Sequence, residues 1–275
     1  MTASPAGTAR TPDARPLPLP VLMYHSVGGA LPERLRDLSV PADRLDEQLG
    51  ALADAGYALV GLTEALVRHA RGDRVVALTF DDGYTDFVDA ALEVLARHDA
   101  RSTLYVPTRH LGGHATWLPD GGHLAILDDE AVREVADRGH EIGSHGAVHV
   151  PLDVLPGALA AAQLRESRHA LEDVVARRVE SFCYPHGYHS RRLREQVRRA
   201  GYTNACAIGH RTSPPGEDPW AVSRLLVGPD HDGPAVLRLV HGGGPHGPVP
   251  ALKRLAGPAW RATRRTALAT GRTWT

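Results

Sequence analysis

Short apolar runs alternate along the chain with longer segments in which apolar residues recur every three or four positions. Residues 75–80 form the clearest run, an unbroken β-rich stretch that is typical of a strand buried on both faces. Residues 42–55 show the other pattern, because Leu45, Leu49 and Leu52 share one face of a helix. Strands that alternate with helices predict a parallel sheet with crossover helices, and hence an α/β fold.

The same patterns place the remaining elements. Strands are expected at residues 18–27, 57–60, 75–80, 103–106, 140–143, 181–184, 203–207 and 221–227. Helices are expected at residues 42–55, 62–69, 85–98, 129–138, 158–177 and 190–200. Residues 109–127 carry paired glycines and Trp117, which predicts a long loop of the kind that usually serves function or motion. The series of elements favours a barrel-like arrangement.

Three regions are expected along the chain: a disordered leader at 1–16, a main domain at 17–241 and a basic tail or helix at 242–275. The leader is rich in Ala, Pro and Thr. After Asp232 the chain has no acidic residue, while arginines accumulate. This tail is interpreted either as a solvated helix or as a weak contact with a membrane or an anionic polymer.

Composition narrows the range of partners and locations. Of the 275 residues, 43% are hydrophobic, which is enough apolar mass for a sizeable core. The 31 basic and 32 acidic side chains nearly cancel, so no overall field attracts nucleic acid and none is expected as a partner. No run of the sequence has the apolar length of a signal peptide core or a membrane span, and a cytoplasmic location is therefore expected.

The two cysteines, Cys183 and Cys206, each lie inside an apolar stretch and have no CxxC partner. A metal site built from thiolates is therefore not expected. Two buried, reduced thiols are the simpler interpretation, and their spacing also permits a disulfide.

Three polar clusters follow predicted strands: Asp81-Asp82-Gly83, His145 with His149, and Tyr24-His25. Parallel α/β folds carry their reacting groups at the carboxyl ends of strands. Adjacent buried carboxylates repel each other unless a cation neutralises one of them, and the other is then free for proton transfer.

His145 and His149 are four residues apart, and on a helix both imidazoles would project from one face. Two histidines with one carboxylate and a water form a common catalytic zinc site. Either motif alone has an ordinary explanation, a turn for the carboxylates and a surface pair for the histidines. Their joint occurrence at strand ends predicts a catalytic metal centre.

The stretches Thr79-Phe80-Asp81-Asp82-Gly83 and Gly139-His140-Glu141-Ile142-Gly143-Ser144-His145, continued to His149, resemble the polysaccharide deacetylases with a NodB-homology domain, carbohydrate esterase family 4. They match that family's TFDDG and HxxxH motifs, and Phe182-Cys183-Tyr184-Pro185-His186-Gly187 resembles its third motif. The resemblance covers about residues 75–227, together with the segment around His25. It implies a distorted (β/α) barrel of about seven parallel strands, with 17–241 as the catalytic domain.

The resemblance also implies a reaction and its residues. Asp81 would be the general base, and Asp82, His145 and His149 would bind a divalent metal. Zinc is the first expectation for the metal, and Co²⁺, Ni²⁺ and Fe²⁺ suit the same ligands. The substrate would be an N-acetylated amino sugar, free, polymeric or in a glycoconjugate.

The chain departs from the family pattern in its third motif and in its late histidine motif. Cys183 and His186 stand where the family has an arginine, which contacts the catalytic aspartate, and a tyrosine. Arg224 is the candidate substitute for that arginine. The family's late acid histidine has no good match, since His231 and His241 lie in different surroundings; some relatives place it in an N-terminal MYH segment, and His25 is therefore expected to be the general acid.

Further residues are expected at the substrate. Tyr184, Pro185, His186, Trp117 and Arg224 are predicted to bind it. A backbone N–H near His186 would stabilise an oxyanion. Trp220 is a second candidate for a sugar-stacking surface.

Two other functions fit parts of the pattern. The fold also serves hydrolysis of non-sugar amides and imides, and a carbohydrate-binding module that has lost turnover would explain the altered third motif. A metal-dependent sugar-nucleotide transferase would use Asp81-Asp82 but leaves the two histidines unexplained. The intact set of acid, base and metal positions favours the deacetylase.

Overall fold

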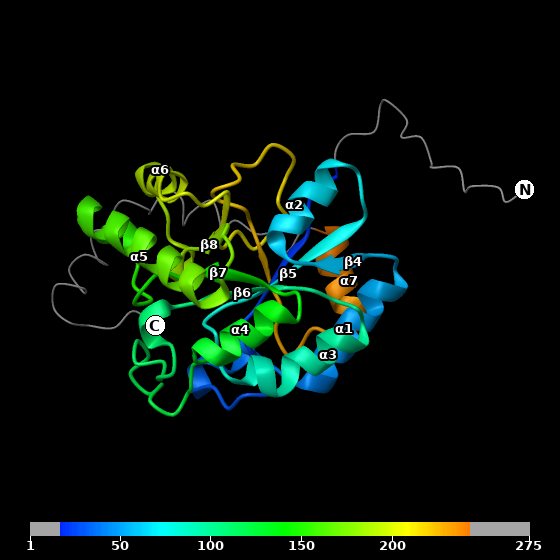
Figure 1. Ribbon diagram of the computed structural model, residues 1–275. Coiled ribbons are helices and arrows are strands. Elements are labelled where there is room, and N and C mark those ends of the chain that lie inside the picture. The colour runs from blue at the N-terminus through cyan, green and yellow to red at the C-terminus, as the bar shows by residue number, and fades with distance from the viewer. Residues whose placement is uncertain (1–16, 243–275) are drawn as a thin grey trace, which may run out of the picture.

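The computed structural model describes residues 17–242, and the predictions for the leader and for the tail beyond Gly242 lie outside them. A sheet of parallel strands occupies the centre, with helices around it (Figure 1). Seven strands follow one another in the order β10-β1-β5-β6-β7-β8-β9, and β4 pairs with β5 beside β6. The strands are β1 (Val21–Tyr24), β4 (Ala58–Val60), β5 (Val75–Phe80), β6 (Thr103–Val106), β7 (Glu141–Ser144), β8 (Ser181–Cys183), β9 (Asn204–Cys206) and β10 (Leu225–Leu226). The predicted fold, a distorted barrel of about seven parallel strands, is confirmed.

The sheet curls because its two ends are joined through the segment before β10. The Ala205 amide donates to the carbonyl of Pro219 at 2.8 Å, and the Val222 amide donates to the carbonyl of Ala205 at 2.9 Å. The chain then continues into β10, which pairs with β1. The carboxyl ends of the seven strands from β10 to β9 therefore surround one mouth of the barrel, whereas β4 ends opposite Ala77, in the middle of β5.

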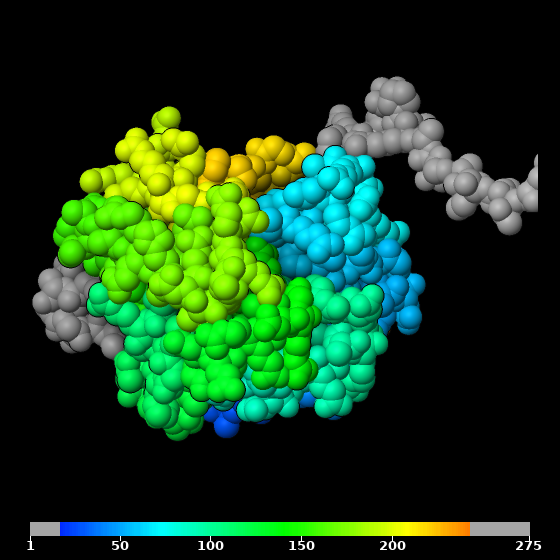
Figure 2. Space-filling model, viewed as in Figure 1, coloured from blue at the N-terminus to red at the C-terminus, as the bar shows by residue number. Residues whose placement is uncertain are grey.

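Helices cover the outside of the sheet. They are α1 (Ala42–Asp54), α2 (Leu62–Ala70), α3 (Leu92–Arg97), α4 (Asp129–Asp137), α5 (Gly157–Val175), α6 (Arg191–Arg199) and α7 (Gly233–Gly242). Side chains of the helices and loops form an almost continuous surface over the sheet on the side shown in Figure 2. Two predicted helices begin at side-chain caps, since Asp128 accepts from the Ala131 amide and Ser190 accepts from the Leu193 amide.

Strand β5 shows why the central run of the sequence is almost entirely apolar, with Thr79 donating its hydroxyl to the Leu22 carbonyl. All six of its residues are buried. Val76 and Leu78 belong to the large cluster between sheet and helices, whereas Val75 and Ala77 belong to a smaller cluster with Tyr105 inside the barrel. Each fully buried Val or Leu contributes about 1.5–3 kcal/mol relative to an exposed one. Both faces of β5 are therefore filled, as its sequence predicts.

Three parts of the chain differ from the predicted elements. The segment predicted as one helix at 85–98 begins with a π-helical turn, Phe87–Ala91, before α3. Helix α7 was not predicted, although Asp232 caps it by accepting from the Ala235 amide. Between β1 and α1, the short strands β2 (Ser26–Val27) and β3 (Ser39–Val40) pair and close a loop that contains a 3₁₀ helix, Glu33–Leu38.

Two further predictions can be compared with the described residues. Cys183 and Cys206 are buried free thiols, paired in register on β8 and β9. None of the described helices is long and apolar enough to span a membrane.

Candidate active site

A cavity of about 330 Å³ opens at the carboxyl ends of the strands. Eight of the predicted residues line it: His25, Asp81, Asp82, Trp117, His145, His149, Tyr184 and His186. They come from segments that follow β1, β5, β7 and β8, with Trp117 from the long loop. The barrel thus brings together residues that are up to 161 positions apart in sequence, from His25 to His186.

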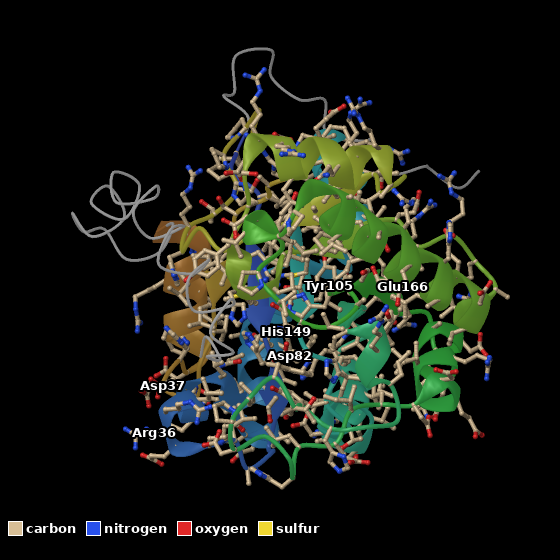
Figure 3. All side chains as sticks on the ribbon, turned by 90° about the vertical axis from the view of Figure 1, so that its left-hand side faces the viewer. Arg36, Asp37, Asp82, Tyr105, His149 and Glu166 are labelled. Carbon is tan, nitrogen blue, oxygen red and sulfur yellow. The ribbon has the colours of Figure 1, made fainter. Side chains whose placement is uncertain are left out.

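Asp82, His145 and His149 meet in a buried cluster. The Oδ1 atom of Asp82 is 3.1 Å from Nε2 of His149 and 3.4 Å from Nε2 of His145. Figure 3 shows Asp82 and His149 next to each other in the interior. Each of the three side chains offers one ligand atom within 4.8 Å of the others.

The local backbone that places these side chains is irregular. Asp82 has φ 76° and His149 has φ 51°, values that non-glycine residues seldom adopt and that often occur at functional sites. Residues 145–149 form a loop, so the helical arrangement considered for His145 and His149 does not apply. Two backbone hydrogen bonds fix this loop. The Thr108 amide donates to the Gly146 carbonyl, and the Arg109 amide donates to the Ala147 carbonyl.

Burial and the two histidines shift the pKa of Asp82 in opposite directions. Burial raises the pKa of its carboxyl group, but the adjacent His149 and His145 outweigh this and hold the pKa well below its usual value. Burial also lowers the pKa of His149, against the pull of Asp82. A carboxylate and an imidazole that is easily kept neutral are the protonation states that metal binding requires.

The cluster has the features of a cation site. Within residues 17–242, Asp82 Oδ1 forms no well-directed hydrogen bond despite the two close imidazole nitrogens, so three lone-pair-bearing atoms converge on one point. The Nδ1 of His145 lies 3.0 Å from the carbonyl oxygen of Cys183, which fixes the ring with Nε2 directed to Asp82. An aspartate and two histidines suit zinc and related divalent metals. The residues present therefore fit a divalent metal.

Asp81 lies beside this cluster, with a carboxylate oxygen within 4.8 Å of a ring nitrogen of His145, and pairs with Arg224. Two parallel hydrogen bonds of 2.7 Å join the guanidinium to the two carboxylate oxygens, and Arg224 is completely buried. Burial raises the pKa of Asp81, but Arg224 outweighs it and leaves the pKa below its usual value. Asp81 is therefore ionised and oriented. Arg224 does not line the cavity, but it is hydrogen-bonded to Asp81, which does.

Of the three histidines considered for the acid, His25 alone lines the cavity. Its Nε2 is 3.9 Å from Oδ2 of Asp81. Burial lowers the pKa of His25, which makes its protonated form a stronger acid, while Asp81 opposes this shift. His231 accepts a hydrogen bond from the Gly228 amide, and His241 lies against Tyr57 near the amino ends of the strands.

The other predicted residues divide between the cavity and its surroundings. Trp117 stacks on His149 with ring centroids 4.6 Å apart. Tyr184 lines the cavity and donates its hydroxyl to the Trp220 carbonyl, whereas Pro185 is buried outside the lining. Trp220 does not line the cavity: its indole N–H donates to the Tyr202 carbonyl and its ring packs against the core.

Several lining residues were not predicted. Tyr84 directly follows the Asp-Asp-Gly motif, and this adjacency was a usable signal. Leu35 and Leu38 come from the 3₁₀ helix, and Leu118 comes from the long loop. His210, an exposed residue with φ 50°, lies beyond β9 in a segment without periodic pattern. These residues form the walls around the polar floor.

Asp86 is a buried carboxyl group just behind this site. It accepts hydrogen bonds from the Ser26 hydroxyl and the Val27 amide, next to His25, and its Oδ1 has no partner among the described residues. Burial raises its pKa to about 6. This folded-state pKa lies above the ordinary value of 3.8. Protonation of Asp86 therefore stabilises the folded state, and this stabilisation is fully present below pH 3.8. This stabilisation is lost as the pH rises through about 6.

Asp86→Asn is therefore expected to make the protein more stable than the wild type at pH 8 and nearly equal to it at pH 4. The gain at pH 8 is about 1–3 kcal/mol, since a shift of one pKa unit corresponds to about 1.4 kcal/mol. Urea unfolding of both proteins at the two pH values measures it. His140, whose pKa burial lowers to about 4, titrates in both proteins and cancels from the difference. An equal difference at both pH values would contradict the prediction.

The fold and this cluster define an α/β barrel with polar residues suited to metal-assisted hydrolysis at its mouth, and known proteins share the fold. Residues 68–205, half of the chain, match the family model for polysaccharide deacetylases. The chain therefore belongs to the polysaccharide deacetylase family. Deacetylases of this family use a divalent metal and act on N-acetylated carbohydrates.

Individual relatives agree with this assignment. The chain is 24% identical over 225 residues to YxkH of Bacillus subtilis, provisionally named a polysaccharide deacetylase, covering 80% of this chain and 75% of that protein. It is 30% identical over 113 residues to a chitin deacetylase of Colletotrichum lindemuthianum, but covers 38% of it. The fold is similar to that of the Streptococcus pyogenes deacetylase PplD (TM-score 0.73, 22% identity, 82% of this chain and 99% of that one). IcaB from Ammonifex degensii has a TM-score of 0.68 at 23% identity, with 81% and 97% covered.

Proposed function

We propose that residues 17–241 form a metal-dependent hydrolase that removes N-acetyl groups from amino sugars, as free oligosaccharides, polymers or glycoconjugates. The observation that carries this proposal is the convergence of Asp82, His145 and His149 beside a separate, ionised Asp81. The Asp82 carboxylate is then available to bind a cation, and the Asp81 carboxylate is available to accept a proton. The family assignment supports the carbohydrate substrate.

In this proposal each residue has a distinct task. A divalent cation held by Asp82, His145 and His149 would polarise the acetyl carbonyl and make a water molecule more acidic. Asp81 removes the proton of the attacking water, and Arg224 keeps its carboxylate ionised and oriented. His25 gives a proton to the departing amine nitrogen. The products are acetate and a free amino sugar.

The cavity walls would bind and orient the sugar. Trp117 presents an aromatic ring, and Tyr184 and His186 lie across the cavity floor. His186 has φ 58°, which turns the backbone sharply at the point where we propose an amide donor for the oxyanion. One such donor contributes about 3–4 kcal/mol to transition-state stabilisation. Zinc is the proposed metal, and Co²⁺, Ni²⁺ and Fe²⁺ suit the same donors.

Acetate release tests this function directly. The protein, loaded with zinc, is incubated with N-acetylglucosamine oligomers, peptidoglycan fragments and simple N-acetyl amides, and acetate is quantified. We expect release from the sugars that stops on chelation and returns with added metal. Release from the simple amides alone would favour a non-sugar amidase, and binding of the oligomers without release would favour a carbohydrate-binding module.

His25→Ala is expected to lower turnover by roughly a hundredfold, the lower end of what a general acid contributes. Metal content should stay at the wild-type level, because His25 is outside the Asp82 cluster. Steady-state acetate release together with metal analysis measures both quantities. His231→Ala, a histidine outside the cavity, is the matched control and should keep full activity; a comparable loss there would remove the case for His25.

A further inference from the structure

Cys183 connects the two halves of the site. It ends β8 and is completely buried. Its carbonyl oxygen accepts from Nδ1 of His145 at 3.0 Å. Its sulfur lies 3.1 Å from Nη2 of Arg224 and 3.6 Å from Oδ2 of Asp81. The backbone of this residue therefore contacts His145, one of the three candidate metal ligands, while its side chain contacts the Asp81–Arg224 pair.

The sulfur completes the hydrogen bonding of Arg224. A guanidinium has five N–H donors in a fixed plane. Nε donates to the Ala207 carbonyl, Nη1 to Thr79 Oγ1 and Asp81 Oδ1, and Nη2 to Asp81 Oδ2 and Cys183 Sγ. Each donor of this buried cation thus has an acceptor. Without the thiol, one N–H would lack a partner and the guanidinium plane would lose one of its restraints.

The thiol is itself held from behind. Cys206 is its register partner on β9, and both residues are buried in the cluster inside the barrel. Tyr105 belongs to the same cluster, and its ring centroid lies 5.9 Å from Cζ of Arg224. Figure 3 shows Tyr105 in the interior, above Asp82 and His149. The sulfur of Cys183 therefore has a fixed place between Arg224 and Asp81.

We propose that the Cys183 thiol is a positioning group that fixes the orientation of the Asp81 carboxylate through Arg224, and so aligns the base with the metal cluster. The thiol accepts from Arg224 and donates to Asp81, so it restrains both members of the pair. The proposal rests on the proposed function for the role of Asp81. The proposed role belongs to the side chain of Cys183 alone. The backbone carbonyl accepts from His145 whatever side chain is present.

Substitutions that change the sulfur alone test this role. Cys183→Ala is expected to lower kcat roughly tenfold, as loss of an outer partner does at metal sites. The KM and the zinc affinity should not change, because the carbonyl contact to His145 remains. Cys183→Ser supplies a hydroxyl with the same donor and acceptor ability and should restore most of kcat. Ser102→Ala, a buried residue bonded to His140 at the other end of the sheet, is the matched control and should keep the wild-type kcat.

A second readout does not depend on activity. In ¹⁵N-labelled protein, with and without zinc, the Nη–H groups of Arg224 should give separate, slowly exchanging NMR signals. These signals should merge in Cys183→Ala and reappear in Cys183→Ser. Unchanged signals in Cys183→Ala, or a kcat equal to that of the wild type, would overturn the positioning role. If the wild-type protein releases no acetate from any sugar, the proposed function fails, and the NMR comparison still decides the role of the thiol.

Discussion

Asp81→Asn is expected to abolish acetate release while the protein retains its metal. The amide cannot accept the proton of the attacking water, and loss of a general base lowers turnover by roughly 10²–10⁴-fold. The three metal-binding candidates are unaltered, so zinc stoichiometry should equal that of the wild type. Acetate quantification and metal analysis on the same preparation measure the two effects.

The Asp81–Arg224 pair adds a stability effect that must be separated from catalysis. In Asp81→Asn the fully buried guanidinium keeps its charge but loses its counter-ion, which costs about 3–5 kcal/mol. The double variant Asp81→Asn with Arg224→Met removes both charges and should recover most of this stability. It should fold, bind zinc and remain inactive. Wild-type turnover in either variant would refute Asp81 as the base.

The sequence was most informative about features that depend on residues adjacent in the chain. The run 75–80 predicted a doubly buried strand because five of its six positions are apolar, and Asp81 and Asp82 had to follow it at the barrel mouth. Successive residues leaving a strand point in opposite directions, which is why one carboxylate meets Arg224 and the other meets His149. The order of these residues was readable from the run itself, whereas Arg224 as the partner of Asp81 was predicted only through the family resemblance.

What escaped prediction depends on long-range packing or on single backbone angles. The i, i+4 spacing of His145 and His149 is equally compatible with a helix and with the observed loop, and the positive φ of His149 has no sequence signal. The wall around Leu35 depends on contacts between two irregular segments, including the Arg34–Asp120 ion pair. Helix α7, by contrast, carried an Asp232 cap and an early proline that could have identified it.

His145→Ala is expected to lose bound metal and activity together. The imidazole supplies one of three ligand atoms, and its own orientation is set by the Cys183 carbonyl, so no neighbouring group can take its place. Metal analysis after dialysis should therefore find substoichiometric zinc, whereas the wild type keeps about one ion per chain, as a three-ligand catalytic site would.

Stability offers an independent measure of the same loss. A ligand that binds the folded state alone stabilises it by about 2.7 kcal/mol at a free concentration of 100 Kd. Added zinc should therefore raise the melting temperature of the wild type but not that of His145→Ala. His186→Ala is the matched control, because its ring lies 4.9 Å from that of His149 in the same cavity but is outside the ligand cluster. It should keep the zinc-dependent shift. Stoichiometric zinc in His145→Ala, or loss of the shift in His186→Ala, would mean that the cation is held by a different set of residues, because removing one of three ligands cannot leave the affinity intact.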